Sequence, residues 1–178
     1  MSIQAAKRYA KALFELADDH DTVEKLQTEL HGFKELLDDE ESLRLIFYSL
    51  DIQAHEKQRL FDELLKNKTS STFINFLKVV FQKHREALFV QMIKEYDALV
   101  DKKLNRVHAK IISAIPLDET MRTDVVAALT HSLKATILLD TTVDKNILGG
   151  FQLQVEDEVL DASLRRKLVE MKSLLRRS

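Results

Sequence analysis

The first 105 residues contain one glycine and no proline, and their apolar side chains recur at every third or fourth position. This spacing is that of one face of an α-helix, so the segment is predicted to fold as amphipathic helices joined by short loops. Six helices are predicted, over residues 5–17, 23–37, 43–50, 60–65, 72–84 and 86–104. Because no strand interrupts them, they predict a helical bundle.

The pattern changes after Asn105. Residues 106–115 alternate apolar and polar side chains, which is the period of a β-strand, and Pro116 ends the run. Asp118 can then cap a helix that runs to about Leu133.

The remainder of the chain continues this mixed pattern. Further strands and a final helix are predicted over residues 136–143, 151–155, 159–160 and 161–175. The chain is therefore predicted to be mainly α with a small α+β module. A six-helix bundle at residues 1–105 precedes a β-α-β-β-β-α module at residues 106–178.

The composition excludes several classes of protein. Lys and Arg (27) nearly balance Asp and Glu (29), whereas a nucleic-acid-binding protein usually has a marked basic excess. The chain has no cysteine, which excludes disulfides, thiolate zinc sites and a cysteine nucleophile. No apolar run approaches the roughly 20 residues that cross a bilayer, and the N-terminal segment lacks the apolar stretch of a secretory signal. We expect a cytoplasmic protein without a nucleic-acid partner.

Gly149 and Gly150 stand together in the segment NILGGFQLQVED, ahead of alternating apolar and polar residues. A phosphate-binding loop needs several spaced glycines and a helix start, and this pair has neither. Glycine also permits positive φ, a bulge or the close approach of another backbone. We interpret the pair as a structural turn.

No arrangement typical of a catalytic or metal site is found in the sequence. No two of the six histidines lie within four positions of each other, which excludes the helical two-histidine zinc motif. Asp157, Glu158 and Asp161 cluster without the alternating ligands and following glycine of a calcium loop. No serine lies in a glycine-flanked nucleophile turn. We therefore expect no catalytic residues, no metal and no cofactor.

Two predicted helices are apolar over more of their circumference than one core requires. In residues 73–82, seven of ten side chains are apolar and span about 220°. The apolar side chains of residues 5–17 span roughly 200°. Either both helices are central and wholly buried, or they share a groove that accepts an amphipathic helix from a partner.

The predicted final helix is strongly basic. Its charged residues are Arg165, Arg166, Lys167, Lys172, Arg176 and Arg177, with Glu170 as the acid. Cations near a helix C-terminus are stabilised by the helix dipole, so a solvated basic face explains them. A contact with an acidic partner helix is the alternative.

Four sequence blocks resemble the delta subunit of bacterial F-type ATP synthases, the counterpart of the mitochondrial oligomycin-sensitivity-conferring protein. The blocks are AAKRYAKALFELA (5–17), INFLKVVFQKHRE (74–86), ISAIPLDE (112–119) and VDKNILGGFQLQVEDEVLDASLRRKL (143–168). They occur in order over nearly the whole chain, which makes the resemblance specific. Lys145 departs from the family, in which proline is frequent at this position.

The resemblance implies a non-catalytic stator subunit, associated with the cytoplasmic face of the bacterial cell membrane only through the ATP synthase. In this family, the N-terminal bundle binds N-terminal helical segments of the alpha subunits in the catalytic head. The C-terminal module binds the C-terminal ends of the b-subunit stalk. The subunit thereby holds the head still, so that rotation remains coupled to proton transport.

The resemblance also assigns partner contacts to the two helices with wide apolar faces. The family's first-helix tyrosine falls on Tyr9, and its fifth-helix apolar contacts fall on Phe76 and Val79. The residues predicted to line the alpha-subunit groove are Tyr9, Ala12, Leu13, Phe76, Val79 and Val80. The candidates for stalk contact are Arg165, Arg166 and Lys172.

Two other functions are compatible with parts of the sequence. One is a helical adaptor of another assembly, such as a ribosome-associated factor that uses the basic final helix, although the balanced charge argues against it. The other is a small enzyme with a composite site. Neither explains the four sequence blocks together.

Overall fold

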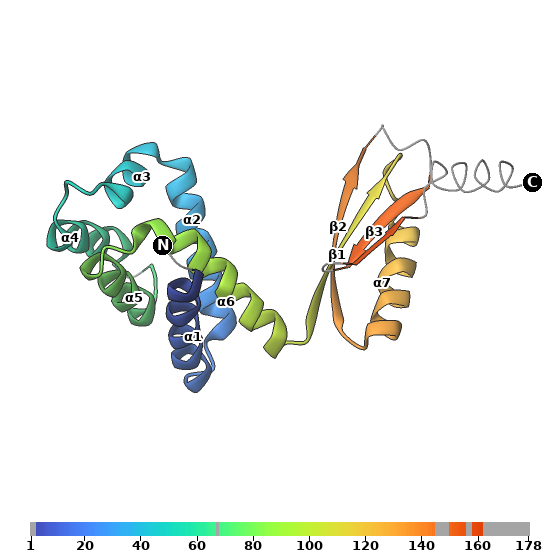
Figure 1. Ribbon diagram of the computed structural model, residues 1–178, viewed down its shortest axis with the longest axis horizontal. Coiled ribbons are helices and arrows are strands. Elements are labelled where there is room, and N and C mark those ends of the chain that lie inside the picture. Colours follow the sequence, from blue (N-terminus) through green and yellow to red (C-terminus); the bar gives the residue numbers. More distant parts are fainter. Residues whose placement is uncertain (1–2, 67, 145–149, 156–157, 162–178) are drawn as a thin grey trace, which may run out of the picture. The chain divides into compact units, whose positions relative to one another are not determined.

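The computed structural model describes residues 3–66, 68–144, 150–155 and 158–161. The chain divides into two compact units, Met1–Lys102 and Lys103–Ser178, and each is described by itself (Figure 1). The prediction of a mainly helical chain with a small sheet is confirmed.

The first unit is helical, and a helix lies at each of the six predicted positions. Its elements are α1 (Ile3–Asp19), α2 (Val23–Asp39), α3 (Glu41–Tyr48), α4 (Ala54–Leu65), α5 (Ser71–Gln82), the short 3-10 helix η1 (Glu86–Leu88) and α6 (Phe89–Lys103). The prediction of one continuous helix over residues 86–104 is wrong in its first turn. His84 has a φ of 49°, which ends α5, and the chain passes through η1 before α6 begins.

Side-chain caps fix where α5 begins. The Ser70 hydroxyl oxygen accepts a hydrogen bond from the Phe73 amide at 3.2 Å, as a helix N-cap does. The same hydroxyl donates to Glu29 Oε2 at 2.6 Å, and the Ser70 amide donates to Glu29 Oε1 at 2.8 Å. Glu29 therefore ties the start of α5 to α2.

Aromatic rings fill the centre of the first unit. Phe33 on α2 is 3% exposed, and its ring meets other rings edge to face. The partners are Phe47, Phe61, Phe73 and Phe89, with centroids at 5.5–5.6 Å. Edge-to-face pairs at this spacing add to the stabilisation that comes from burying the rings.

A buried ion pair lies beside these rings. Lys57 Nζ donates to Glu86 Oε1 at 2.8 Å and to the Phe47 carbonyl oxygen at 2.9 Å. The two charged side chains are 2% and 5% exposed, and the ammonium lies 5.7 Å from the centre of the Phe81 ring. The Lys57 ammonium thus joins α4 to the last turn of α3 and to the first residue of η1.

The second unit is a small sheet with one described helix. Its elements are β1 (Arg106–Ser113), α7 (Glu119–Leu133), β2 (Thr136–Val143), β3 (Phe151–Val155) and β4 (Glu158–Asp161). The strand order is β2-β1-β3-β4, with β1 and β2 parallel and the other neighbours antiparallel. The predicted strands and the predicted helix after Asp118 are confirmed, and the predicted final helix lies outside the described residues.

The core of the second unit is aliphatic and lies between the sheet and α7. Its fully buried cluster consists of Ala109, Ile111, Ile137 and Leu139, against which Val125, Val126 and Leu129 of α7 pack. Asp118 caps α7 through a 2.7 Å hydrogen bond from the Met121 amide to its Oδ1. This bond, together with one from the Thr120 hydroxyl, holds the pKa of Asp118 below its usual value.

Gly150 directly precedes β3 and has a φ of 82°, a conformation that a Cβ atom would strain. This backbone geometry explains a glycine at position 150. Gly149 lies outside the described residues.

Candidate partner-binding groove

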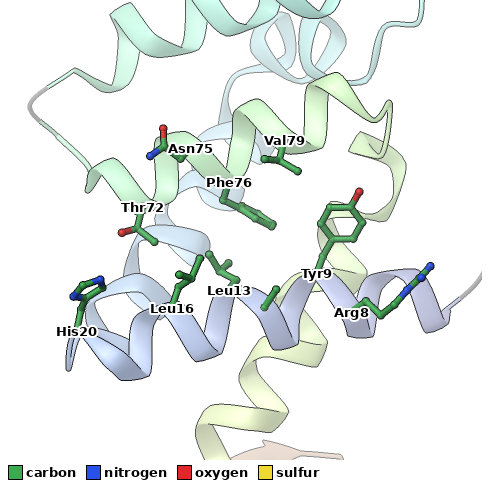
Figure 2. A pocket seen from close by; sticks show the side chains of 10 residues that line it. Arg8, Tyr9, Leu13, Leu16, His20, Thr72, Asn75, Phe76 and Val79 are labelled. Carbon is green, nitrogen blue, oxygen red and sulfur yellow. The ribbon is translucent and has the colours of Figure 1, made fainter.

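An open groove of about 630 Å³ lies between α1 and α5 (Figure 2). Arg8 and Tyr9 lie at the end of the groove where Val79 is found, and His20 lies at the end where Thr72 is found, so the two helices run in opposite directions. The lining residues are Arg8, Tyr9, Ala12, Leu13, Leu16 and His20 on one wall and Thr72, Asn75, Phe76 and Val79 on the other.

The α1 wall comes from a helix that is apolar on two sides. One side is fully buried and consists of small residues and one leucine: Ala5, Ala6, Ala10, Leu13 and Ala17. The other side carries Tyr9, Ala12 and Leu16 toward the groove, and Leu16 is 53% exposed. The alanines let α1 approach its neighbours closely, and Tyr9 and Leu16 are left on the open side.

The α5 wall is formed in the same way. Phe73, Leu77, Val80 and Phe81 face the interior of the first unit and are buried. Phe76 lines the groove and is 8% exposed, whereas Val79 is 42% exposed. The exposure of Leu16 and Val79 contradicts the alternative that both helices are wholly buried.

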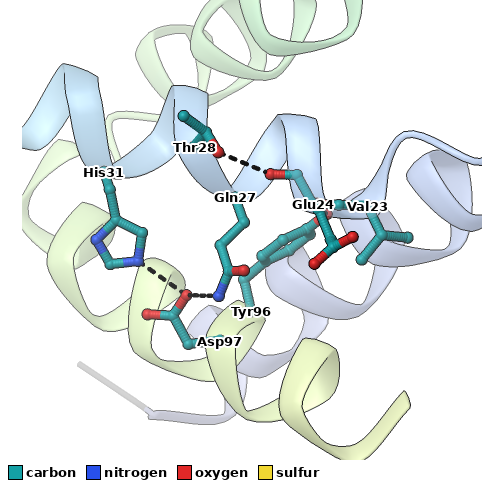
Figure 3. A network of polar contacts seen from close by, with 7 residues as sticks. All are labelled: Val23, Glu24, Gln27, Thr28, His31, Tyr96 and Asp97. Carbon is teal, nitrogen blue, oxygen red and sulfur yellow. Dashed lines mark hydrogen bonds and ion pairs between the residues drawn. The ribbon is translucent and has the colours of Figure 1, made fainter. Parts of the chain in front are cut away.

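The back of α1 is held in place from α6. The Phe14 ring on α1 meets the Tyr96 ring edge on, with centroids at 6.0 Å. The Tyr96 hydroxyl donates to the Val23 carbonyl oxygen at 3.1 Å (Figure 3). Burial raises the pKa of Tyr96, and the nearby Asp18 and Asp97 carboxylates raise it further, so the hydroxyl stays protonated and able to donate.

A polar network next to Tyr96 joins α2 to α6. Gln27 Nε2 donates to Asp97 Oδ1 at 2.8 Å, and His31 Nε2 lies 2.9 Å from the same oxygen (Figure 3). These contacts fix α6 on α2, and α6 in turn fixes Phe14. The α1 wall of the groove is therefore held in place by α6, which is itself hydrogen-bonded to α2.

Most of the predicted groove residues are brought together by the structure. Tyr9, Ala12, Leu13, Phe76 and Val79 all line the groove.

Val80 does not line the groove, because it is 0% exposed and faces the interior of the first unit. Val80 lies about 100° around the helix from Val79, which places it on the buried side of α5. Arg165, Arg166 and Lys172 lie outside the described residues.

The residues that the sequence prediction missed are mainly the polar ones. Helical spacing could have found two of the missed residues, because Leu16 follows Ala12 by four positions, and Asn75 precedes Val79 by four. Arg8, His20 and Thr72 stand at the ends of the groove, where apolar periodicity gives no signal.

Within the described residues, no cluster of three or more His, Asp or Glu side chains could hold a metal ion. None of the helices described there is both long and apolar enough to span a lipid bilayer.

An open apolar groove between two helices is typical of proteins that bind an amphipathic helix from a partner. The fold and the site therefore define a class of mainly helical protein with an open apolar groove in its helical unit and a small mixed sheet. The family model described as ATP synthase delta (OSCP) subunit matches residues 5–175. The chain belongs to this family.

Relatives in two bacteria support this assignment. The chain is 33% identical to ATP synthase subunit delta of Alkaliphilus oremlandii over 175 residues, which cover 98% of this chain and 97% of the relative. It is 36% identical to the protein of the same name in Caldanaerobacter subterraneus over 163 residues, which cover 92% and 91%. Family members named in this way are structural subunits of ATP synthase, so this chain is a structural subunit and not a catalytic one.

The fold is shared with a solved structure. A chain in the cryo-EM structure of the Toxoplasma gondii mitochondrial ATP synthase hexamer aligns with a TM-score of 0.69 at 23% identity, over 96% of each chain. At this identity, the alignment shows the fold alone.

Proposed function

We propose that this chain is a stator subunit of an F-type ATP synthase, placed through that complex at the cytoplasmic face of a bacterial membrane. It joins the alpha subunits of the catalytic head to the b-subunit stalk, so that rotation of the central rotor remains coupled to proton transport. The observation that carries the proposal is the groove between α1 and α5, with Leu16 and Val79 open to solvent.

In this proposal, the groove holds the N-terminal helical segment of an alpha subunit. The segment covers Leu16 and Val79 and packs against Tyr9 and Phe76. A joint that bears repeated torque needs a slow dissociation rate, and well-packed apolar contacts at the centre of an interface provide it. No bond is made or broken in this function, which is why a groove without a catalytic cluster is sufficient.

The second unit takes the stalk in this proposal. With the predicted boundary near residue 105, residues 1–105 bind the head and residues 106–178 bind the C-terminal ends of the b subunits. Arg165, Arg166 and Lys172 are the proposed stalk contacts on the strength of their positive charge.

The groove assignment is tested by combining Tyr9→Ala with Val79→Ala in the full chain. Calorimetry with the alpha N-terminal segment is expected to show at least about a tenfold loss of affinity, because two central apolar contacts are removed. The matched control is Tyr48→Ala with Val90→Ala, which removes the same side chains from sites 37% and 38% exposed outside the groove. Equal affinity of both double variants would remove the assignment.

A coupling measurement tests the stator role itself. Membranes that carry the ATP synthase with the Tyr9→Ala and Val79→Ala variant are expected to hydrolyse ATP while pumping fewer protons for each ATP. Membranes with the control variant are expected to keep the normal ratio. An unchanged ratio in both would contradict the stator function.

The division of partners is tested by a shorter chain. Residues 1–105 alone are expected to fold and to bind the alpha segment with the affinity of the full chain. A disordered fragment would show that the boundary near residue 105 is misplaced.

A further inference from the structure

Charged side chains along the α1 rim of the groove are separated by sign. Arg8 and Ala12 line the groove, and Glu15 and Asp19 continue the same stripe of α1 at intervals of three and four residues, next to the lining residues. The three charged side chains are exposed. The stripe starts with a cation near the N-terminus of α1 and ends with anions near its C-terminus.

This order is opposite to the one that a helix favours for its own stability. The helix dipole favours anions in the first turn and cations in the last turn. α1 has neither an acidic residue in its first turn nor a basic residue in its last turn. Glu15 forms an exposed pair with Lys11 at 3.7 Å, but exposed pairs of this kind contribute little and do not reverse the order. The arrangement therefore does not serve α1 itself.

The α5 rim strengthens the separation. Val79 lies opposite Tyr9 (Figure 2). Lys83 is the C-cap residue of α5 and follows Val79 by four positions, so helical spacing continues the α5 stripe to a cation. At the other end, α5 contributes the uncharged Thr72. The charges beside the groove are therefore basic at the Arg8 end and acidic at Glu15 and Asp19, toward the end that His20 lines.

Building on the proposed function, we propose that the groove selects an amphipathic helix whose acidic first turn lies at Arg8 and Lys83 and whose basic last turn lies at Glu15 and Asp19. The bound helix then runs parallel to α1. Helices stabilised by their own dipole carry acids first and bases last. Because the order on α1 is inverted, such a helix complements the rim in this one direction.

The rim charges act on direction and selectivity more than on total affinity. Charged groups at the edge of an interface change association and exclude the wrong orientation, whereas the apolar centre supplies most of the binding free energy. Tyr9 and Phe76 therefore hold the helix, and Arg8 and Asp19 decide which way it points.

Designed peptides test this inference in the full-length protein. Two helical peptides share one apolar stripe and have blocked ends. One carries glutamates in its first turn and lysines in its last turn, and the other carries the reverse. Each has a nitroxide at its N-terminus, which broadens nearby amide signals in the nuclear magnetic resonance spectrum. The acid-first peptide is expected to broaden Arg8 and Ala12, and the base-first peptide is expected to broaden Asp19 and His20.

A charge reversal gives the second measurement. Arg8→Glu is expected to weaken the acid-first peptide about tenfold at low salt and less than about threefold at high salt, because rim charges are screened. Arg59→Glu is the control, since it makes the same charge change at an exposed site on α4.

The outcomes separate this inference from the proposed function. The inference would be overturned if both peptides bound in the same direction or if neither peptide bound. It would also be overturned if Arg8→Glu and Arg59→Glu had equal effects. If the double substitution at Tyr9 and Val79 still abolished binding of the alpha segment, the stator proposal would stand without the inference about the direction of the bound helix. If that segment failed to bind while the peptides followed their charges, only the stator proposal would fall.

Discussion

The two units of the chain bury their residues in different ways. The first unit encloses Phe33 with four further rings and buries the charged pair of Lys57 and Glu86 beside them. The second unit has a small aliphatic cluster, and no residue of α7 is fully buried in the described structure. The comparison shows that a unit with a filled core can leave apolar surface uncovered along one pair of helices. The second unit also exposes apolar side chains, among them Ile115, Met121 and Val159.

The largest effect is expected from Phe33→Ala, which empties the centre of the ring cluster. We expect the free energy of unfolding of the first unit to fall by about 3–5 kcal/mol, because a buried ring is lost and a cavity remains. Urea unfolding followed by near-ultraviolet circular dichroism measures this loss. Phe151→Ala, at a site 40% exposed in the second unit, is the control, and a similar loss there would break the comparison.

The buried ion pair gives the next effect. Lys57→Met is expected to lower the free energy of unfolding by about 3 kcal/mol, because Glu86 is left as a buried charge without its cation. Adding Glu86→Leu is expected to restore most of that loss, since no buried charge then remains. If the double variant were no more stable than the single one, the loss would not come from the unpaired charge of Glu86.

A smaller effect is expected in the second unit. Leu129→Ala should cost about 1–2 kcal/mol, because Leu129 is only partly buried where it packs on the sheet. Amide hydrogen exchange of α7 and β2 measures the loss separately from the first unit. A cost as large as that of Phe33→Ala would show that the two cores are equally tight.

The smallest effect has the opposite sign. Gly32 lies within α2, and a Cβ atom placed on it would meet no atom within 4 Å. Gly32→Ala is therefore expected to raise the free energy of unfolding by about 0.5–1 kcal/mol, because alanine has the higher helix propensity. Gly150→Ala is the contrasting control in a thermal melt, since its φ of 82° predicts destabilisation.

Secondary structure follows closely from local patterns in both units. The strands predicted at 136–143 and 151–155 have the observed bounds. Residues 136–143 are rich in β-branched side chains, which favour strands, and residues 151–155 alternate apolar and polar side chains, which reports the two faces of a sheet. The start of α4 was placed too late, at residue 60 and not at Ala54, because its first turn is polar and carries no apolar spacing. The break before α6 depends on the positive φ of His84, which no local pattern predicts.

The location of the groove was predictable, but its details were not. The width of the apolar faces on residues 5–17 and 73–82 indicated which two helices carry spare surface. It did not indicate which flank turns inward, since Val79 and Val80 are identical in chemistry and differ only in direction. The buried pair of Lys57 and Glu86 joins residues 29 positions apart, so its partners become visible only when the helices pack.

The open groove also has a consequence for how much of this chain can be made. Leu16 and Val79 face water, and in the proposed function they do so until the partner helix covers them. Polar residues at these two positions would keep surplus copies from aggregating. They would also remove the apolar surface that binds the partner helix. Copies made in excess of the proposed partner therefore expose an apolar surface that promotes aggregation. This favours matched synthesis of the two polypeptides.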